Sequence, residues 1–354
     1  MKNIIHVSEI DISQNGGMAR VEYYLKKSFE QLGYNFIHIG PKEVGEIKHK
    51  GLFPYLAYMH FKKLNVKPYL FIVHEPAAGQ FINKGVPCFV ESHGIERRIW
   101  NINKKNESFK TKMLFPIWRL YNCDRGIKNS KKILVLNSTD KKYVIDFYKR
   151  NENDIFIYKN GVFSIDESIE TSKNDDFFTI LFNGSWIERK GIYTLIKAAD
   201  KIYNAGIFDV QYLLIGTGKT EEEVINYWPY HLKSFLKIIP KFESNQEIDL
   251  LKQSNIFILP SISEGQPLSL LQAMAVGKCC ITTNADGQKD IITNGQNGYL
   301  FNVGNYDELS ELIIKCYSNR NLCNKIGEKA KESVTNRTWE KTSLELVKYI
   351  IDNI

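Results

Sequence analysis

The sequence lacks the short motifs that mark several large enzyme classes. It contains no P-loop, no HExxH motif, no GxGxxG dinucleotide fingerprint and no recognisable Ser–His–Asp arrangement. A strand-end DxD, which would hold a divalent cation between carboxylates and a diphosphate, is also missing. If a diphosphate binds, protein cations and helix dipoles must neutralise it. We therefore expect metal-independent chemistry, with no metal site and no cofactor.

The sequence also lacks paired cysteines and long apolar runs. Its cysteines show no CxxC pair and no metal-ligand spacing; they are Cys88, Cys123, Cys279, Cys280, Cys316 and Cys323. No apolar run approaches the length that spans a bilayer, and the first 11 residues read as a strand rather than a signal peptide. We expect reduced, mostly buried thiols in a cytoplasmic protein.

The charge is divided unevenly along the 354 residues. Residues 1–162 contain 27 Lys and Arg against 15 Asp and Glu, whereas the remainder contains 20 against 25. The basic first half favours an anionic partner, such as the inner face of the cell membrane. Solvated lysines explain the same excess. The basic, aromatic segment 96–132 leaves two interpretations open, a membrane-facing surface or two ordinary packed helices.

Strand-like and helix-like segments alternate twice along the chain. The first run ends near residue 162, the polar, acidic segment 163–176 is typical of a linker, and the alternation restarts at 178. Alternating units predict an α/β fold with parallel sheets and helices on both faces. Two such runs predict two doubly wound, Rossmann-like domains facing a central cleft. Residues 221–236 look helical, and 338–354 form a last amphipathic helix.

The helix predicted over 268–276 is apolar nearly all round. Pro267 suits its first position and Gly277 its end, so we expect it to be buried. Gln272 lies in its middle and needs a hydrogen-bond partner, because an unsatisfied buried amide costs ~1–3 kcal/mol. That partner is either protein or ligand.

Four loops fall at the predicted carboxyl ends of strands, where α/β sheets bind ligands. In the first, Gly16 and Gly17 precede a helix, which allows close approach of an anion but also fits a simple turn. In the second, His93 follows an apolar strand and can exchange a proton or hold a hydroxyl, although taken alone this histidine favours a structural role.

The other two loops carry opposite charges. Arg189 and Lys190 lie just before a helix near Gly191, an arrangement that suits a diphosphate but also occurs as plain surface charge. Glu264 precedes Gly265, whose neighbouring amides can hold phosphate. A carboxylate for sugar hydroxyls beside donors for phosphate is what a sugar nucleotide requires.

Taken in order, these stretches resemble the family 4 glycosyltransferases, a retaining type with two Rossmann-like domains (the GT-B architecture). The similar segments are "GGMARVEYYLKKSFEQLGY", "SHG", "YKNGV", "NGSWIERKGI", "LLIGTG", "EGQPLSLLQAMAVGKCCITTNADGQKDIITNGQNGYLF" and "TWEKTSLELVKYI". The similarity is dense from 180 to 305 and thin from about 40 to 130. The resemblance implies an N-terminal acceptor-side domain over 1–165, a nucleotide-sugar domain over 166–335 and a helix over 336–354 that crosses back to the first domain.

The resemblance also implies a role for each matching residue. Glu264 would contact the sugar hydroxyls, Lys190 would neutralise the diphosphate, and His93 would lie at the transferred sugar. The remaining donor contacts would be Gly16 and Gly17 near the phosphate, Ser185 and Arg189 in the phosphate loop, Gly265, Pro267 and the amides of Gln266 and Leu268 around the phosphates, Gln272 at the ribose and Lys241 near the base.

Two positions depart from the family pattern. The family has a second Glu where this chain has Gln272, and it usually has Arg where this chain has Ser185. Arg189 can compensate for the missing arginine from its neighbouring position. We expect both departures to affect the choice of nucleotide and the catalytic rate more than the fold.

The resemblance predicts transfer of a sugar from a nucleotide sugar, UDP- or GDP-linked, to a glycan or lipid-linked acceptor in surface polysaccharide or glycolipid biosynthesis. An anionic membrane surface would be a second partner, and no nucleic acid is expected. Two alternatives stay open. One is a nucleotide-sugar epimerase or phosphorylase on the same architecture, and the other is a non-catalytic subunit that binds sugar nucleotides.

Overall fold

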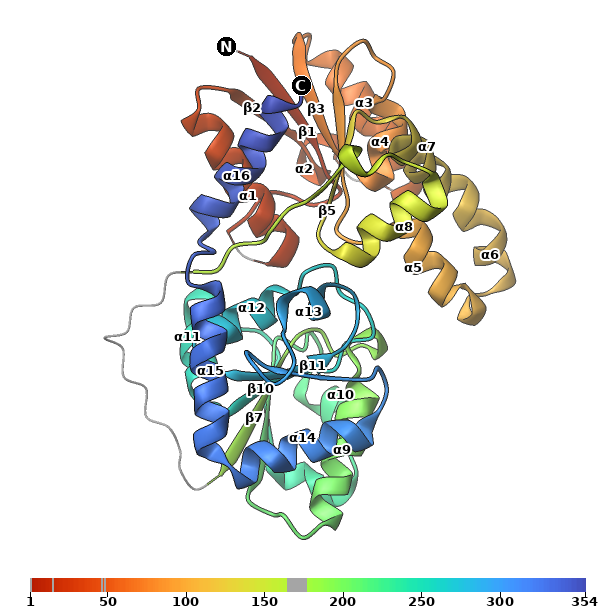
Figure 1. Cartoon of the computed structure of the whole chain (residues 1–354). Coiled ribbons are helices and arrows are strands. Elements are labelled where there is room, and N and C mark those ends of the chain that lie inside the picture. Colours follow the sequence, from red (N-terminus) through yellow and green to blue (C-terminus); the bar gives the residue numbers. More distant parts are fainter. Residues whose placement is uncertain (1, 15, 46, 48, 164–176) are drawn as a thin grey trace. The chain divides into compact units, whose positions relative to one another are not determined.

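The computed structural model describes residues 2–14, 16–45, 47, 49–163 and 177–354 (Figure 1). The chain divides into two compact units. Unit 1 is Met1–Asn160 together with Trp339–Ile354, and unit 2 is Gly161–Thr338. The predicted boundaries at 165 and 335 lie a few residues from these divisions. Most of the predicted linker, 164–176, lies outside the described residues.

Unit 1 is built on a six-stranded parallel sheet with the order β2-β1-β3-β4-β5-β6. Its strands are β1 (Asn3–Val7), β2 (Asn35–Ile39), β3 (Pro68–His74), β4 (Cys88–Glu91), β5 (Lys132–Val135) and β6 (Ile155–Ile157). Its helices are α1 (Gly17–Gln31), α2 (Pro41–Val44), η1 (Lys50–Leu52), α3 (Phe53–Lys63), α4 (Glu75–Phe81), α5 (Glu96–Asn103), η2 (Lys104–Asn106), α6 (Phe109–Phe115), η3 (Pro116–Leu120), α7 (Tyr121–Asn129), α8 (Ser138–Tyr148), η4 (Glu152–Asp154) and α16 (Trp339–Asp352).

Unit 2 has a second six-stranded parallel sheet, ordered β12-β11-β10-β7-β8-β9. Its strands are β7 (Phe178–Asn183), β8 (Val210–Ile215), β9 (Leu236–Ile239), β10 (Ile256–Leu259), β11 (Cys279–Thr283) and β12 (Tyr299–Phe301). Its helices are η5 (Glu188–Lys190), α9 (Ile192–Asn204), α10 (Glu221–Ile225), η6 (Tyr230–Phe235), η7 (Ser244–Gln246), α11 (Glu247–Lys252), α12 (Leu268–Ala275), α13 (Asp286–Ile291), α14 (Tyr306–Ser318) and α15 (Arg320–Val334).

Both sheets have the doubly wound form that the alternating pattern predicts. In unit 2, side chains of β7 alternate between the two faces, so Phe182 joins the core under α9 and α14 while Leu181 joins the core under α11 and α12. Burial on both faces explains why these strands are almost continuously apolar. The predicted α/β class with two Rossmann-like domains is confirmed.

One helix prediction was wrong. Residues 221–236 do not form a single helix, because α10 ends at Ile225 and the chain continues as η6 and then β9. Pro229 lies between the two short helices, where a proline removes a backbone donor and clashes with the preceding turn. The apolar residues that suggested one helix are divided among α10, η6, the turn between them and the first residue of β9.

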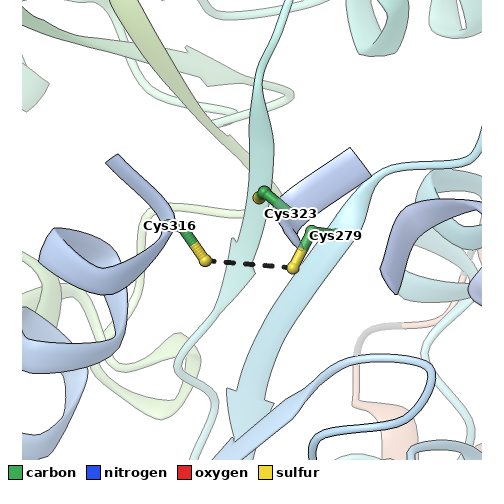
Figure 2. Close-up of side chains that lie close together, drawn as sticks. All are labelled: Cys279, Cys316 and Cys323. Carbon is green, nitrogen blue, oxygen red and sulfur yellow. Dashed lines mark hydrogen bonds between the residues drawn. The ribbon is translucent and has the colours of Figure 1, made fainter. Parts of the chain in front are cut away.

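The six cysteines are free and buried, as predicted. Figure 2 shows three of them meeting in unit 2: Cys279 from β11, Cys316 from α14 and Cys323 from α15. The sulfur atoms of Cys279 and Cys316 lie 3.9 Å apart. Burial raises the pKa of the Cys88 thiol in unit 1 to about 12, so that thiol is neutral at physiological pH.

No helix among the described residues is both long and apolar enough to cross a membrane.

Candidate functional site

The strand order of unit 2 identifies where a ligand would bind. β7 and β10 are neighbours, and the chain leaves β7 toward β8 on one side but leaves β10 toward β11 on the other. Such a reversal opens a crevice at the carboxyl ends of the strands, which is the usual ligand position in an open α/β sheet. The loop after β7 carries Arg189 and Lys190, and the loop after β10 carries Glu264.

These three charged residues form one ion cluster. The Nζ atom of Lys190 donates to Oε1 of Glu264 at 2.6 Å, and Nη1 of Arg189 lies 3.3 Å from Oε2. Burial opposes ionisation of Glu264, but Lys190 and then Arg189 outweigh it and lower the pKa of the carboxyl below its ordinary value. Glu264 is therefore ionised at neutral pH although it is only 9% exposed.

The backbone of the two loops is fixed by direct contacts. Ile262 donates its amide to the carbonyl of Arg189 at 2.9 Å, and the Arg189 guanidinium donates to the carbonyl of Ser263 at 2.7 Å. Gly191 has φ 74°, and a Cβ there would lie 1.9 Å from the carbonyl oxygen of Pro260. Only glycine allows this approach, so Gly191 fixes the spacing between the cations and Glu264.

A second glycine closes the other side of the Glu264 loop. The amide of Gly287 donates to the Glu264 carbonyl at 3.1 Å. A Cβ at Gly287 would lie 1.8 Å from the carbonyl oxygen of Gly265. The start of α13 therefore packs directly on the loop, which holds Glu264 in a defined position.

Gln272 supplies the buried amide whose partner the sequence left open. It lies on α12, is 1% exposed, and neither its side-chain oxygen nor its nitrogen has a hydrogen-bond partner among the described residues. Buried polar atoms in proteins are rarely left in this state, since the cost is about 1–3 kcal/mol for each group. The protein alternative thus finds no support in the described part of the chain, and a ligand partner is favoured.

The other residues predicted in unit 2 lie in different environments. Ser185 and Lys241 are exposed in the loops after β7 and β9. Pro267 is the N-cap residue of α12 and Leu268 its first residue.

The side chain of Gln266 accepts a hydrogen bond from Arg337, a contact that the sequence did not suggest. Burial lowers the pKa of Arg337 to about 10, which still leaves it charged at neutral pH.

The residues predicted in unit 1 also lie at a strand-order reversal, between β1 and β3. Gly16 has φ 90° and is the N-cap residue of α1, which begins at Gly17. His93 follows β4 and is largely buried. Its Nε2 lies 3.4 Å from Oε1 of Glu22, and its Nδ1 lies 3.4 Å from the Tyr158 hydroxyl.

A cavity of about 780 Å³ opens beside His93 within unit 1. Apolar side chains from several elements line it together with ionisable groups, among them His74, Glu75, Glu91, Glu96 and Arg119. Arg119 donates to Glu9 at 2.7 Å and to Glu96 at 2.6 Å, so it ties together two walls of the cavity. A mixed lining of this size can hold a small polar molecule such as a sugar.

The sequence did not identify the acidic and imidazole neighbours of His93. Glu22 lies in the middle of α1, and His74 and Glu91 end β3 and β4. They are far apart in the sequence and match no motif. One pattern was available: His74, Glu91 and His93 all fall at strand ends, which parallel pairing brings to one edge of the sheet.

Residues 164–333 match the family model for glycosyl transferases, group 1. The match covers just under half of the chain and falls within unit 2, which is similar to this family. The matched range contains β7, β10 and the Lys190–Glu264 cluster described above.

Curated relatives are similar over part of their length. An uncharacterised glycosyltransferase of Methanocaldococcus jannaschii is 28% identical over 214 residues, covering 60% of this chain and 57% of the relative. The UDP-Gal:alpha-D-GlcNAc-diphosphoundecaprenol alpha-1,3-galactosyltransferase of Escherichia coli is 24% identical over 247 residues, covering 65% and 60%. The chain thus matches less than two thirds of the length of each.

Solved structures support the fold over the whole chain. WaaG, described as a glycosyltransferase involved in lipopolysaccharide biosynthesis, superposes with a TM-score of 0.78 over 98% of this chain and 99% of its own, at 12% identity. The chain shares the GT-B glycosyltransferase fold.

Proposed function

We propose that this chain transfers a sugar from a nucleotide diphosphate sugar to a glycan or lipid-linked acceptor, with retention of configuration at the anomeric carbon. The observation that carries the proposal is the ionised, buried Glu264 held by Lys190 and Arg189 at the strand-order reversal of unit 2. It offers oxygens for sugar hydroxyls and, beside them, cations for a diphosphate.

The donor diphosphate would be held without a metal ion. One of the three ammonium N–H groups of Lys190 donates a hydrogen bond to Glu264, so the other two remain available for phosphate oxygens. The first amides of α12, around Leu268, favour an anion at the helix N-terminus. The two cations and these amides would offset the charge that grows on the leaving diphosphate.

Gln272 would bind the ribose of the donor. Its unpartnered amide oxygen can accept from a ribose hydroxyl, and its NH₂ group can donate to a ribose oxygen. Lys241, exposed after β9, would lie near the base. We propose UDP as the nucleotide, because the E. coli relative is named for a UDP-galactose donor, with GDP as the alternative.

In the transfer step the bond between the anomeric carbon and the diphosphate oxygen breaks, and a bond to an acceptor oxygen forms on the same face. The acceptor hydroxyl gives its proton to an oxygen of the leaving diphosphate, which departs with the electron pair of the broken bond. Glu264 would hold the sugar as positive charge develops at the anomeric carbon. His93, beside the cavity of unit 1, would lie at the transferred sugar.

The acceptor would meet unit 1 at a membrane surface. Phe109, Met113, Ile117 and Tyr121 recur every four residues from α6 to the start of α7 and are 81%, 58%, 68% and 61% exposed. This apolar stripe is accompanied by exposed lysines, at positions 104, 105, 110 and 112. Exposed apolar residues flanked by lysine are typical of a surface that lies against anionic lipid. We propose the inner face of the cell membrane as its place.

A thermal-shift screen of nucleoside diphosphates and their sugars tests the donor site. At a hundred times the dissociation constant, a ligand stabilises the protein by about 2.7 kcal/mol, which raises the melting temperature measurably. UDP or GDP should stabilise the chain, whereas nucleoside monophosphates should do so less. If none of these compounds shifts the melting temperature at millimolar concentration, the donor site is wrong.

Turnover of the stabilising sugar nucleotide separates the enzyme classes. Transfer to a lipid-linked sugar would support the proposal. Epimerisation of the donor sugar without an acceptor would indicate an epimerase, and tight binding without any turnover would indicate a non-catalytic subunit.

Metal independence gives a prediction of its own. The affinity for UDP, measured by calorimetry, should be the same in buffer and in excess EDTA, because Lys190 and Arg189 supply the positive charge. Loss of UDP binding in EDTA, restored by Mg²⁺ or Mn²⁺, would contradict the charge argument.

A further inference from the structure

A second group of ionisable side chains is buried in unit 1, beneath the cavity. His6 comes from β1, Glu22 from α1, His74 from the end of β3 and Glu91 from the end of β4. One ring nitrogen or carboxylate oxygen from each lies within 4.8 Å of the others. All four are at most 6% exposed. Two imidazoles and two carboxylates therefore converge at a point with almost no contact with solvent.

The two histidines point one nitrogen inward and have the other nitrogen occupied. His6 Nδ1 is hydrogen-bonded to His38 Nδ1 at 2.9 Å, and His74 Nδ1 to the Ser8 hydroxyl at 3.2 Å. Their Nε2 atoms each lie 2.6 Å from an oxygen of Glu22. An outer hydrogen bond that orients an imidazole toward a central point is the arrangement seen around metal-binding histidines.

Several atoms that face this point lack a hydrogen bond of ordinary geometry among the described residues. They are Nε2 of His6, Oε2 of Glu22 and both carboxylate oxygens of Glu91. The described groups nearest to the Glu91 carboxylate also include the Tyr158 hydroxyl and, at 3.8 Å, Nε2 of His93. With neutral imidazoles, the two buried carboxylates would carry two uncompensated negative charges, and an uncompensated buried charge costs several kcal/mol. A divalent cation would balance both charges while the imidazoles stay neutral.

We propose that His6, Glu22, His74 and Glu91 bind one divalent transition-metal ion, with Zn²⁺ as the first choice. Two imidazole nitrogens and two carboxylate oxygens form a mixed donor set that suits zinc. All four ligands belong to unit 1, whereas the proposed nucleotide contacts Lys190, Glu264 and Gln272 belong to unit 2. Glu22 also lies 3.4 Å from Nε2 of His93, which the proposed transfer uses.

Small movements would bring the four groups to a tetrahedral site. With bonds of about 2.0–2.1 Å, neighbouring ligand atoms around zinc lie about 3.3–3.4 Å apart. The two Glu22 contacts of 2.6 Å would widen, and the 3.8 Å separation of His74 and Glu91 would shorten. His74 and Glu91 also line the cavity, which gives the ion a route from solvent.

A metal site would explain why ionisable residues occupy buried positions that the proposed transfer does not use. Glu22 is fully buried on a helix whose other buried positions are mostly apolar, and His6 lies within a buried strand. These residues are 16 positions apart, and His74 and Glu91 follow much later in the sequence. The spacing matches no metal motif, because parallel strands and a helix, rather than a short loop, bring the ligands together.

Metal binding by the tag-free full chain tests the proposal. After treatment with chelator and dialysis, the chain should take up about one Zn²⁺ per molecule, measured by elemental analysis, and its melting temperature should rise. Co²⁺ in place of zinc should give the intense visible absorption of a four-coordinate ion, a measurement that needs no variant. Uptake well below one ion per chain, or Co²⁺ with only the spectrum of the hydrated ion, would overturn the site and leave a proton-sharing network of histidines and carboxylates.

Variants locate the ion. Glu91→Gln and His74→Gln should each lower zinc affinity at least tenfold, and Ser8→Ala, which removes an outer hydrogen bond, about tenfold. The matched control is His231→Gln, an exposed imidazole in unit 2 whose loss should leave zinc affinity unchanged. Equal zinc affinity in all four variants and the unaltered chain would mean adventitious binding elsewhere. UDP affinity should stay constant throughout, which keeps this test separate from that of the donor site.

Discussion

At the scale of single residues, Gln272 offers the sharpest test of the donor site. In Gln272→Glu, the new carboxylate would lie in a buried position with no donor among the described residues, so the ligand-free protein should lose about 1–3 kcal/mol of stability. Bound UDP should restore the lost stability, because a ribose hydroxyl would then donate to the new carboxylate. A hydroxyl donates more strongly to a charged acceptor, so UDP should bind the variant more tightly by up to about 1–2 kcal/mol. Melting temperatures with and without UDP give both values.

A second buried glutamine provides the control. The NH₂ group of Gln288 donates to the Ser261 carbonyl at 3.2 Å and to the Thr283 hydroxyl at 2.7 Å, so this group, unlike that of Gln272, has protein partners. The side-chain oxygen of Gln288 has no partner among the described residues. Gln288→Glu should lose stability and gain no affinity for UDP. If Gln272→Glu behaves in the same way, Gln272 belongs to the core and the ribose assignment is wrong.

Lys190 should contribute to stability as well as to binding. Lys190→Met keeps most of the side-chain stem but removes the shorter ion pair of the buried Glu264 and leaves the longer one, to Arg189. We expect a loss of about 2 kcal/mol at neutral pH, the order of a charge-assisted hydrogen bond, and clearly weaker UDP binding.

The pH dependence of this loss has a defined sign. The folded-state pKa of Glu264 is lowered, so the pair stabilises the chain above the carboxyl's unfolded pKa, and this stabilisation disappears as pH falls through the lower, folded value. Denaturation from pH 7 downward should therefore show the two proteins converging in strong acid. A constant difference at all pH values would mean that the lysine acts through packing alone.

At the scale of elements, the segment from α6 to α7 should bind anionic lipid through its exposed stripe. Replacing Phe109 and Ile117 by Ser should weaken binding to vesicles that contain phosphatidylserine, because these two apolar side chains are 81% and 68% exposed. Replacing Lys110 and Lys112 by Gln should weaken binding mainly at low salt, since the Debye length is only about 8 Å at physiological ionic strength.

The control for the lipid test is Tyr230→Ser. Tyr230 is 90% exposed but belongs to unit 2, so its loss should not affect vesicle binding. Sedimentation with vesicles measures all three variants. Binding that is unchanged by both stripe variants, or absent for the unaltered chain at low salt, would separate this surface from any membrane role.

The same segment shows what the sequence could predict at this scale. Its aromatic residues left two alternatives open, a membrane surface and ordinary packing, with packing favoured. The structure separates the side chains of this segment into two groups. Trp100 is buried and stacks on Phe115 with the ring centroids 4.5 Å apart, whereas Phe109 and Ile117 are exposed. The sequence could not separate the buried from the exposed side chains. A π-helical turn, η3, interrupts the helical stretch, so the packed face does not recur with one constant helical period.

At the scale of the whole molecule, both sheets could be predicted because apolar strands and amphipathic helices alternate regularly. The loops near Lys190 and Glu264 were also accessible, since parallel strands bring their carboxyl ends to one edge. The Lys190–Glu264 contact itself could not be predicted. It depends on the close approach of Gly191, which follows β7, to Pro260, which follows β10. His6 and Glu22 were missed for a related reason: a strand interior and a helix face carry them, and only the packing of α1 on the sheet brings them together.

The last helix should stabilise unit 1 and leave unit 2 unaffected. α16 is separated from the rest of unit 1 by the whole of unit 2, yet it packs on α1, where Ser343 and Ser28 hydroxyls are 2.7 Å apart and Trp339 stacks on Tyr24. Leu346→Ala should therefore cost about 2–5 kcal/mol, the usual range for a buried leucine, within unit 1 only.

Hydrogen exchange read by mass spectrometry measures where this cost falls. Peptides from α1 and β6 should exchange faster in Leu346→Ala, while peptides from β7 and β10 keep their rates. Leu309→Ala, which truncates a buried leucine of α14 in unit 2, should give the opposite pattern. The two variants remove the same side chain from different units, so any difference in pattern reports on location alone. Faster exchange across both units in either variant would mean that the two fold as one cooperative body, and α16 would then stabilise the whole chain.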